Sequence, residues 1–141
     1  MTDAVLLEQF RDICRMRGWK FTSQRFAVYC HMHGNAAHPT ADMVRHALLP
    51  DYPGISRDSV FRILNDLAGS SVIVRMPQTD PVRFDGNPGR HDHFFCLHCG
   101  RIVDFKVEIP VTALPETVGE LHGLALRADG LCRDCLSRSK K

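Results

Sequence analysis

The sequence has no long apolar run and almost no net charge, and each absence excludes a class of protein. No stretch of its 141 residues approaches the ~20 apolar residues that cross a bilayer, so we expect no membrane association. The formal net charge of +2 excludes a histone-like polycation, but not a nucleic-acid binder whose basic residues gather on one face. The N-terminal residues lack the basic start and apolar stretch of a secretory signal. We therefore expect a cytoplasmic protein.

The chain also lacks the spread of cysteines that a disulfide framework needs. Four of its six cysteines form two Cys-x-x-Cys pairs, Cys96 with Cys99 and Cys132 with Cys135. Because thiols stay reduced in the cytosol, metal binding is a better explanation than disulfides. Two such pairs suit a closed tetrahedral zinc site with four thiolates. The alternative is a redox dithiol, but the surrounding sequence shows no thioredoxin-like βαβ pattern.

The first part of the chain has the pattern of helices followed by a β-hairpin. Apolar residues recur at helical spacing over residues 6–14 and again after Thr22, Thr40 and Ser56, each a good N-cap residue. We predict strands at 72–74 and 82–85, joined by a turn at 78–81. These are the elements of a winged helix-turn-helix, although other small α+β domains share them.

The segment Gly-Asn-Pro-Gly at residues 86–89 is the strongest linker signal. It predicts an α+β chain with a winged-helix domain at 1–85, a linker at 86–90 and a second domain at 91–141. In the second domain we predict strands at 93–95, 102–105 and 124–126, and a helix at 115–122. We expect the tail from Ser137 to Lys141 to be disordered. A unit of about fifty residues is too small to be stable on its own core, which favours a structural role for zinc.

The predicted fourth helix carries polar side chains on the face opposite its apolar stripe. Arg and Asn can read base edges in the major groove, and a serine near the helix start can reach a phosphate. A run of basic residues between residues 11 and 25 adds further candidates, although a solvated helix face explains such a run equally well. Phe61 could instead occupy a partly buried boundary position. The candidate DNA contacts are Arg17, Arg25, Arg57, Ser59, Phe61, Arg62 and Asn65.

A second group of candidate ligands contains imidazoles and carboxylates but no sulfur. His91 and His93 are two residues apart, so on a strand they share a face. Such donors favour Fe(II), Mn(II) or Zn(II) over Cu(I), although a histidine pair is often merely structural. Ligands on both sides of the linker would make domain orientation depend on metal occupancy, as in a sensor. The group comprises His38, Asp85, His91, His93 and Asp104.

Several motifs between Arg17 and Cys135 carry a resemblance to a known family. They are Thr22-x-Gln24-Arg25, His38-Pro39-Thr40-Ala41-Asp42, Ser59-Val60-Phe61-Arg62-x-Leu64, Arg83-Phe84-Asp85, His91-x-His93-x-x-Cys96-x-x-Cys99-Gly100-x-Ile102-Val103-Asp104-Phe105 and Cys132-x-x-Cys135. With these motifs the sequence resembles the ferric uptake regulator family. The resemblance implies a homodimeric, metal-dependent repressor that binds double-stranded DNA at an AT-rich inverted repeat. It also implies an N-terminal winged helix and a small C-terminal α/β dimerisation domain.

The resemblance also assigns the two ligand groups. By position, Cys96, Cys99, Cys132 and Cys135 would hold structural Zn(II), and His38, Asp85, His91, His93 and Asp104 would hold regulatory Fe(II) or Mn(II). The aspartate at 85 is similar to the peroxide-sensing branch, whereas iron-sensing members tend to use glutamate. That likeness implies that peroxide acting on the Fe(II) form would oxidise His38 or His91 and release the DNA, while Mn(II) would support binding with a poor response.

Three alternatives are open from the sequence. One is an iron, manganese or zinc uptake regulator that responds to the metal level only. Another is a zinc-dependent enzyme that activates water at the His/Asp group, but no general-base motif is evident and we expect no enzyme. The third is a zinc-stapled protein-interaction module. Phe61 departs from the family, which usually has a tyrosine at that position of the recognition helix.

Overall fold

The computed structural model describes residues 2–76, 79–108, 110 and 114–139. They belong to two compact units, Met1–Pro88 and Gly89–Lys141, whose boundary falls within the stretch expected to be a linker. Gln78, part of the predicted turn, lies outside the described residues. Within the described ranges, no helix has both the length and the apolar character that crossing a membrane requires.

The first unit begins with four helices, as predicted: α1 (Asp3–Arg17), α2 (Ser23–Met32), α3 (Ala41–Leu48) and α4 (Arg57–Gly69). The three predicted N-caps are confirmed, because the side chains of Thr22, Thr40 and Ser56 each accept a hydrogen bond from the backbone N–H three residues on. Each bond satisfies an amide that the first helical turn leaves without an intrahelical acceptor.

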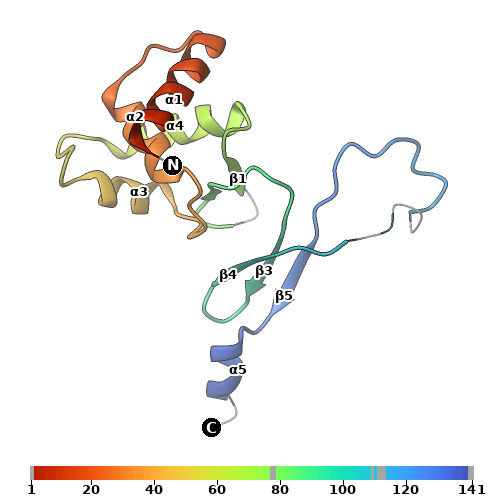
Figure 1. Ribbon diagram of the computed structural model, residues 1–141. Coiled ribbons are helices and arrows are strands. Elements are labelled where there is room, and N and C mark those ends of the chain that lie inside the picture. Colours follow the sequence, from red (N-terminus) through yellow and green to blue (C-terminus); the bar gives the residue numbers. More distant parts are fainter. Residues whose placement is uncertain (1, 77–78, 109, 111–113, 140–141) are drawn as a thin grey trace. The chain divides into compact units, whose positions relative to one another are not determined.

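The predicted apolar face of α4 is also confirmed. α4 packs against α2 and α3, and its inward residues Val60, Ile63, Leu64 and Leu67 are buried. The core continues into α1 through Phe10, which is fully buried. The four helices share one apolar core, and the hairpin that follows them in the chain packs onto it through Phe84 (Figure 1).

A two-stranded hairpin completes the first unit in the manner of a winged helix. β1 (Val74–Met76) pairs antiparallel with β2 (Arg83–Asp85), in a register that places Val74 opposite Asp85. β1 therefore starts later than the predicted 72–74. The backbone N–H of Phe84 donates to the carbonyl oxygen of Pro39 at 2.9 Å, which ties β2 to the loop before α3.

The second unit is a three-stranded sheet followed by a short helix. β3 (Asp92–Cys96) lies between β4 (Ile102–Phe105) and β5 (Arg127–Gly130); it runs antiparallel to β4 and parallel to β5. The chain then enters α5 (Arg133–Ser139). Figure 1 shows β3 and β5 leading toward the end of the sheet at which α5 begins.

Three predictions for this unit are wrong. The strand expected at 124–126 starts instead at Arg127, because β5 takes its register from β3 and not from its own apolar residues. Residues 115–122 form no helix; Val118 donates to the carbonyl of Pro115 in a single turn. The tail expected to be disordered from Ser137 is helical as far as Ser139.

Gly86, which directly follows β2, offers a test of the packing in the first unit. It is buried against the end of α2, and its N–H donates to the carbonyl of Asn35 at 3.2 Å. A Cβ at this position would overlap the carbonyl oxygen of Met32 and lie 2.7 Å from the nitrogen of Asn35. We expect Gly86→Ala to destabilise the unit by about 1–3 kcal/mol, measured by urea unfolding.

Gly69 provides the matched control. It lies at the end of α4, and a Cβ there would meet no atom within 4 Å. Gly69→Ala should be neutral or stabilise by up to ~1 kcal/mol. Equal unfolding free energies for the two variants would contradict the close packing at Gly86.

Candidate functional site

Four cysteine side chains converge at one end of the second unit. Cys96 ends β3, Cys132 directly precedes α5, and the parallel register that pairs Cys96 with Gly130 brings them together. The four sulfur atoms all lie within 4.8 Å of one another, and the sulfur atoms of Cys99 and Cys132 are 3.8 Å apart. Sulfurs that surround a tetrahedral zinc at ~2.3 Å are about 3.8 Å from one another, so Cys96, Cys99, Cys132 and Cys135 could hold that ion.

Local hydrogen bonds prepare this cluster for a cation. The backbone N–H groups of Cys99 and Cys132 lower the pKa of the Cys96 thiol to about 5, which makes it a thiolate at neutral pH. Hydrogen bonding to Cys132, together with burial, raises the pKa of Cys135 to about 12. A bound metal ion must displace the protons that the cluster retains without it.

The cluster is also a large part of the core of its unit. Of the second unit's described residues, the buried apolar ones are Phe95, Cys96, Cys132 and Cys135. So small a core supplies little hydrophobic stabilisation. An ion bound by the cysteines would contribute directly to the folding free energy of this unit.

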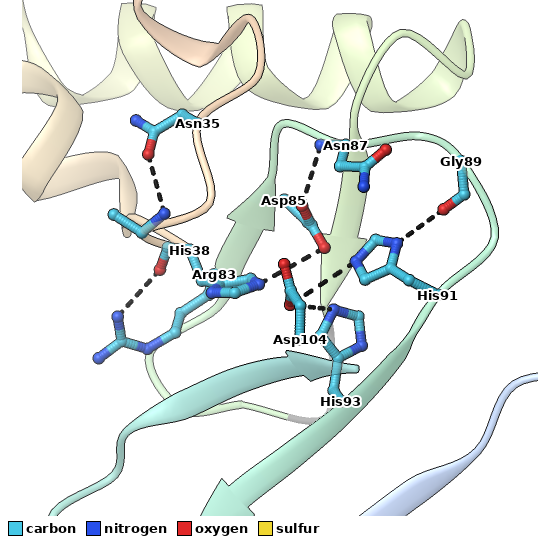
Figure 2. A network of polar contacts seen from close by, with 10 residues as sticks. Asn35, His38, Arg83, Asp85, Asn87, Gly89, His91, His93 and Asp104 are labelled. Carbon is cyan, nitrogen blue, oxygen red and sulfur yellow. Dashed lines mark hydrogen bonds and ion pairs between the residues drawn. The ribbon is translucent and has the colours of Figure 1, made fainter. Parts of the chain in front are cut away.

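In the first unit, a histidine and an aspartate are buried side by side. Asp85, the last residue of β2, is 0% exposed, and His38, in the loop before α3, is 2% exposed. Nε2 of His38 lies 3.5 Å from Oδ2 of Asp85 (Figure 2). The other carboxylate oxygen accepts a hydrogen bond from the backbone N–H of Asn87 at 2.9 Å. This contact orients the carboxylate and directs Oδ2 toward the imidazole.

In the second unit, two histidines face one carboxylate. The pairing of β3 with β4 places His93 opposite Asp104. Oδ1 of Asp104 lies 3.4 Å from Nε2 of His93 and 3.7 Å from Nε2 of His91, as Figure 2 shows. Nδ1 of His91 lies 2.7 Å from the carbonyl oxygen of Gly89. Because a carbonyl only accepts, Nδ1 carries the proton and Nε2 keeps the lone pair that binds a metal.

Both groups have the chemistry and spacing of metal ligands. Nitrogen and oxygen ligands at ~2.0–2.2 Å from one divalent ion lie about 3 to 3.5 Å apart, and the observed separations of 3.5, 3.4 and 3.7 Å fall close to that range. The structure thus brings His38 to Asp85 within the first unit, and His91 and His93 to Asp104 within the second.

Asp92 lies between the two histidines in sequence but has a different role. It is fully buried, and its carboxylate accepts hydrogen bonds from the backbone N–H groups of Val107 and Leu126 at 3.2 and 3.1 Å. The guanidinium of Arg90 is 3.8 Å away. Asp92 therefore fastens β3 to the segments that follow β4 and precede β5.

The outer face of α4 carries the candidate DNA-reading residues. Arg57 and Arg62 are exposed, and Phe61 is 38% exposed. Ser59 and Asn65 are half-buried. The predicted outward face is therefore largely accessible.

The hairpin adds a residue to this face that sequence reasoning missed. Arg75 of β1 donates from Nη1 to Oδ1 of Asn65 at 3.0 Å, and its guanidinium lies 5.7 Å from the centre of the Phe61 ring. With its oxygen engaged, Asn65 presents N–H donors, whereas bidentate reading of adenine uses a donor and an acceptor. No spacing pattern could have revealed this contact, because Arg75 and Asn65 lie on different elements.

The two basic candidates outside α4 differ in their surroundings. Arg25 of α2 is half-buried, lies 3.6 Å from Asp66 of α4, and covers the ring of Trp19 at 5.6 Å. Its side chain therefore joins α2 to α4. Arg17 is exposed at the end of α1 and donates to the carbonyl oxygen of Ser70 at 3.5 Å.

Known proteins resemble this chain over most of its length. The model of the ferric uptake regulator family matches residues 16–127. The peroxide-responsive repressor PerR of Staphylococcus aureus is 31% identical over 134 residues, which cover 92% of this chain and 90% of the relative.

Solved structures show the same likeness. The ferric uptake regulator Fur of Helicobacter pylori, which has three functional metal binding sites, is 25% identical, with a TM-score of 0.77 and coverage of 96% of this chain and 95% of that chain. PerR from Streptococcus pyogenes is 25% identical, with a TM-score of 0.52 and coverage of 91% of each chain.

The cysteine cluster leads to a direct test. We expect Cys96→Ser to lose bound zinc and to unfold the second unit, because a hydroxyl is a far poorer zinc ligand than a thiolate. Zinc per chain is measured by atomic emission, and unfolding by circular dichroism. Cys30→Ser, at a half-buried position of α2 outside the cluster, is the control and should keep its zinc. A Cys96→Ser protein with its full zinc content and unchanged stability would contradict the assignment.

Proposed function

This chain belongs to the ferric uptake regulator family, and from that premise we propose that it is a transcriptional repressor that senses hydrogen peroxide through a bound metal ion. As a member of the family it is a metal-dependent DNA-binding regulator and not an enzyme. The zinc-dependent enzyme considered from the sequence is therefore discarded.

The regulatory ion, Fe(II) or Mn(II), is held by the nitrogen and oxygen donors described above. Its ligands are His38, Asp85, His91, His93 and Asp104. Three imidazoles and two carboxylates without sulfur suit these ions. The observation that carries the proposal is the buried pairing of His38 with Asp85, because a short aspartate side chain stands where the resemblance implies glutamate in iron-sensing members.

The response to peroxide consumes a ligand. Fe(II) held by His38, Asp85, His91, His93 and Asp104 would supply the reducing power that cleaves the O–O bond of hydrogen peroxide. In the net balance, one peroxide oxygen is added to a ring carbon of His38 or His91, the other leaves as water, and the imidazole provides the two electrons. An oxidised imidazole is a poor ligand, so the protein loses the ion and releases its DNA. Mn(II) is a weaker reductant and supports DNA binding with little response.

The second unit serves dimerisation and is held together by Zn(II) on the four cysteines. Relatives of the family are dimeric regulators, and this unit exposes apolar side chains that a partner subunit would cover: Leu97, Val103, Leu131 and Leu136. A homodimer with twofold symmetry matches an operator that is an inverted repeat.

DNA is bound by the first unit, with α4 in the major groove and the remaining basic residues on the phosphates. The contacts proposed are Arg57, Ser59, Phe61, Arg62 and Asn65 from α4, with Arg17 and Arg25 beside it. Because a protomer with a net charge of +2 gains little from non-specific attraction, DNA binding depends on the metal-loaded dimer. A weakly charged repressor of this kind can be released readily.

A second candidate function is a regulator that responds to the metal level alone. The Helicobacter pylori ferric uptake regulator is as similar in sequence to this chain as the Streptococcus pyogenes repressor, at 25% identity each, which supports this second candidate. The two functions differ in one respect that can be measured, which is the fate of the DNA complex when peroxide is added.

We expect the protein loaded with Fe(II) or Mn(II) to bind an AT-rich inverted-repeat duplex, measured by fluorescence anisotropy. Added hydrogen peroxide should abolish binding of the Fe(II) form only, and mass spectrometry should locate one added oxygen atom on a peptide that contains His38 or His91. Binding by the Fe(II) form that survives peroxide would leave the metal-level regulator as the function.

Asp85→Glu is the matched variant, since it keeps the carboxylate and its charge but lengthens the side chain. It should retain Mn(II)-dependent DNA binding and lose peroxide sensitivity in the Fe(II) form. Sensitivity equal to that of the wild type would count against a role for Asp85 in selecting the signal.

A further inference from the structure

His38 has a backbone conformation that is uncommon for residues other than glycine. Its φ angle is +52°, in the left-handed region, and its side chain is buried. In that region the Cβ of an L-residue crowds the following carbonyl oxygen, so residues other than glycine enter it only when surrounding contacts hold them there. The loop before α3 must therefore contain a specific restraint on His38.

The restraint comes from β2, and in particular from Arg83. Its Nη1 atom donates to the backbone carbonyl oxygen of His38 at 2.9 Å, as Figure 2 shows. The backbone that follows His38 is also hydrogen-bonded to β2. The N–H of Phe84 donates to the carbonyl oxygen of Pro39 at 2.9 Å, and Thr40 forms an isolated antiparallel β-bridge with Arg83. The carbonyl of His38 is therefore fixed in direction, and with it the direction of the imidazole.

Arg83 is itself anchored within the hairpin. Its backbone N–H donates to Oγ1 of Thr79 at 2.9 Å, and its Cα partner across the hairpin is Met76. Arg83 and Asp85 are two residues apart on β2, so they lie on the same face of the strand. One strand thus supplies the carboxylate that faces His38 and the guanidinium that holds the backbone of His38 in place.

We propose that Arg83 is a positioning residue for the regulatory metal site: by fixing the backbone of His38 in its left-handed conformation, it keeps the imidazole facing Asp85 and raises the affinity for the ion. This inference rests on the proposed function of the His/Asp group. Without the guanidinium, the loop loses a donor and the backbone of His38 is free to return to negative φ. The imidazole would then turn away from Asp85.

The measurement is a Mn(II) titration of the zinc-containing protein without DNA, in which electron paramagnetic resonance detects the free Mn(II). Arg83→Met keeps the length of the side chain but removes the donor. We expect it to weaken Mn(II) binding about tenfold, the lower end of the range for residues that support metal ligands. Zinc content and unfolding midpoint should match the wild type. Arg83→Lys retains one donor and should recover part of the affinity.

Two controls separate positioning from other roles of an arginine. Arg15→Met removes an exposed positive charge from the same unit and should leave the Mn(II) affinity unchanged. In a His38→Ala background, Arg83→Met should have no further effect on that affinity, because the ligand that Arg83 positions is already absent. An arginine that stabilised the hairpin in general would weaken binding in both backgrounds.

Different measurements would overturn the role of Arg83 and the proposed function of the His/Asp group. Wild-type affinity in Arg83→Met, or an equal loss in the His38→Ala background, would overturn the role of Arg83 and leave the proposed function standing. A wild-type protein that takes up no Mn(II) beyond its zinc would overturn the proposed function, and this inference with it.

Discussion

Only five residues separate Asp85, which ends β2, from His91, which precedes β3. Even a fully extended chain of that length spans no more than about 20 Å, so the linker limits the separation of Asp85 and His91 in every arrangement of the two units. A short linker gives the ligands of one unit a high effective concentration around the ligands of the other. The proposed regulatory site depends on this constraint, because its five ligands come from both units: two from the first, His38 and Asp85, and three from the second, His91, His93 and Asp104.

In the proposed function the two groups of ligands have different purposes, since one supports folding and the other controls DNA binding. The first unit has an extensive apolar core and needs no ion to fold, whereas the described core of the second unit is mostly cysteine. The ion proposed for the cysteine cluster therefore contributes to folding, and it must stay bound for the second unit to remain folded. The His/Asp group draws on residues that their own units already hold in place, so its ion can leave without unfolding either unit. A reversible signal requires this separation.

Local chemistry was predictable from the sequence, and contacts between distant segments were not. The starts of three helices were predicted from Thr22, Thr40 and Ser56, because N-capping is a local interaction. The Cys-x-x-Cys pairs and the His91/His93 spacing identified the candidate ligands for the same reason. β5 was misplaced because its position depends on Asp92 and on pairing with β3. The left-handed backbone of His38 and the contact of Arg75 with Asn65 leave no trace in residue type or spacing.

In the proposed function, metal binding and DNA binding are coupled through one site, and coupling of this kind is reciprocal. The most direct test is the Mn(II) affinity of the zinc-containing dimer, measured with and without a saturating duplex selected by the Mn(II)-loaded protein from random sequence. DNA should raise the Mn(II) affinity by the same factor by which Mn(II) raises the affinity for DNA. A Mn(II) affinity that DNA leaves unchanged would contradict the account.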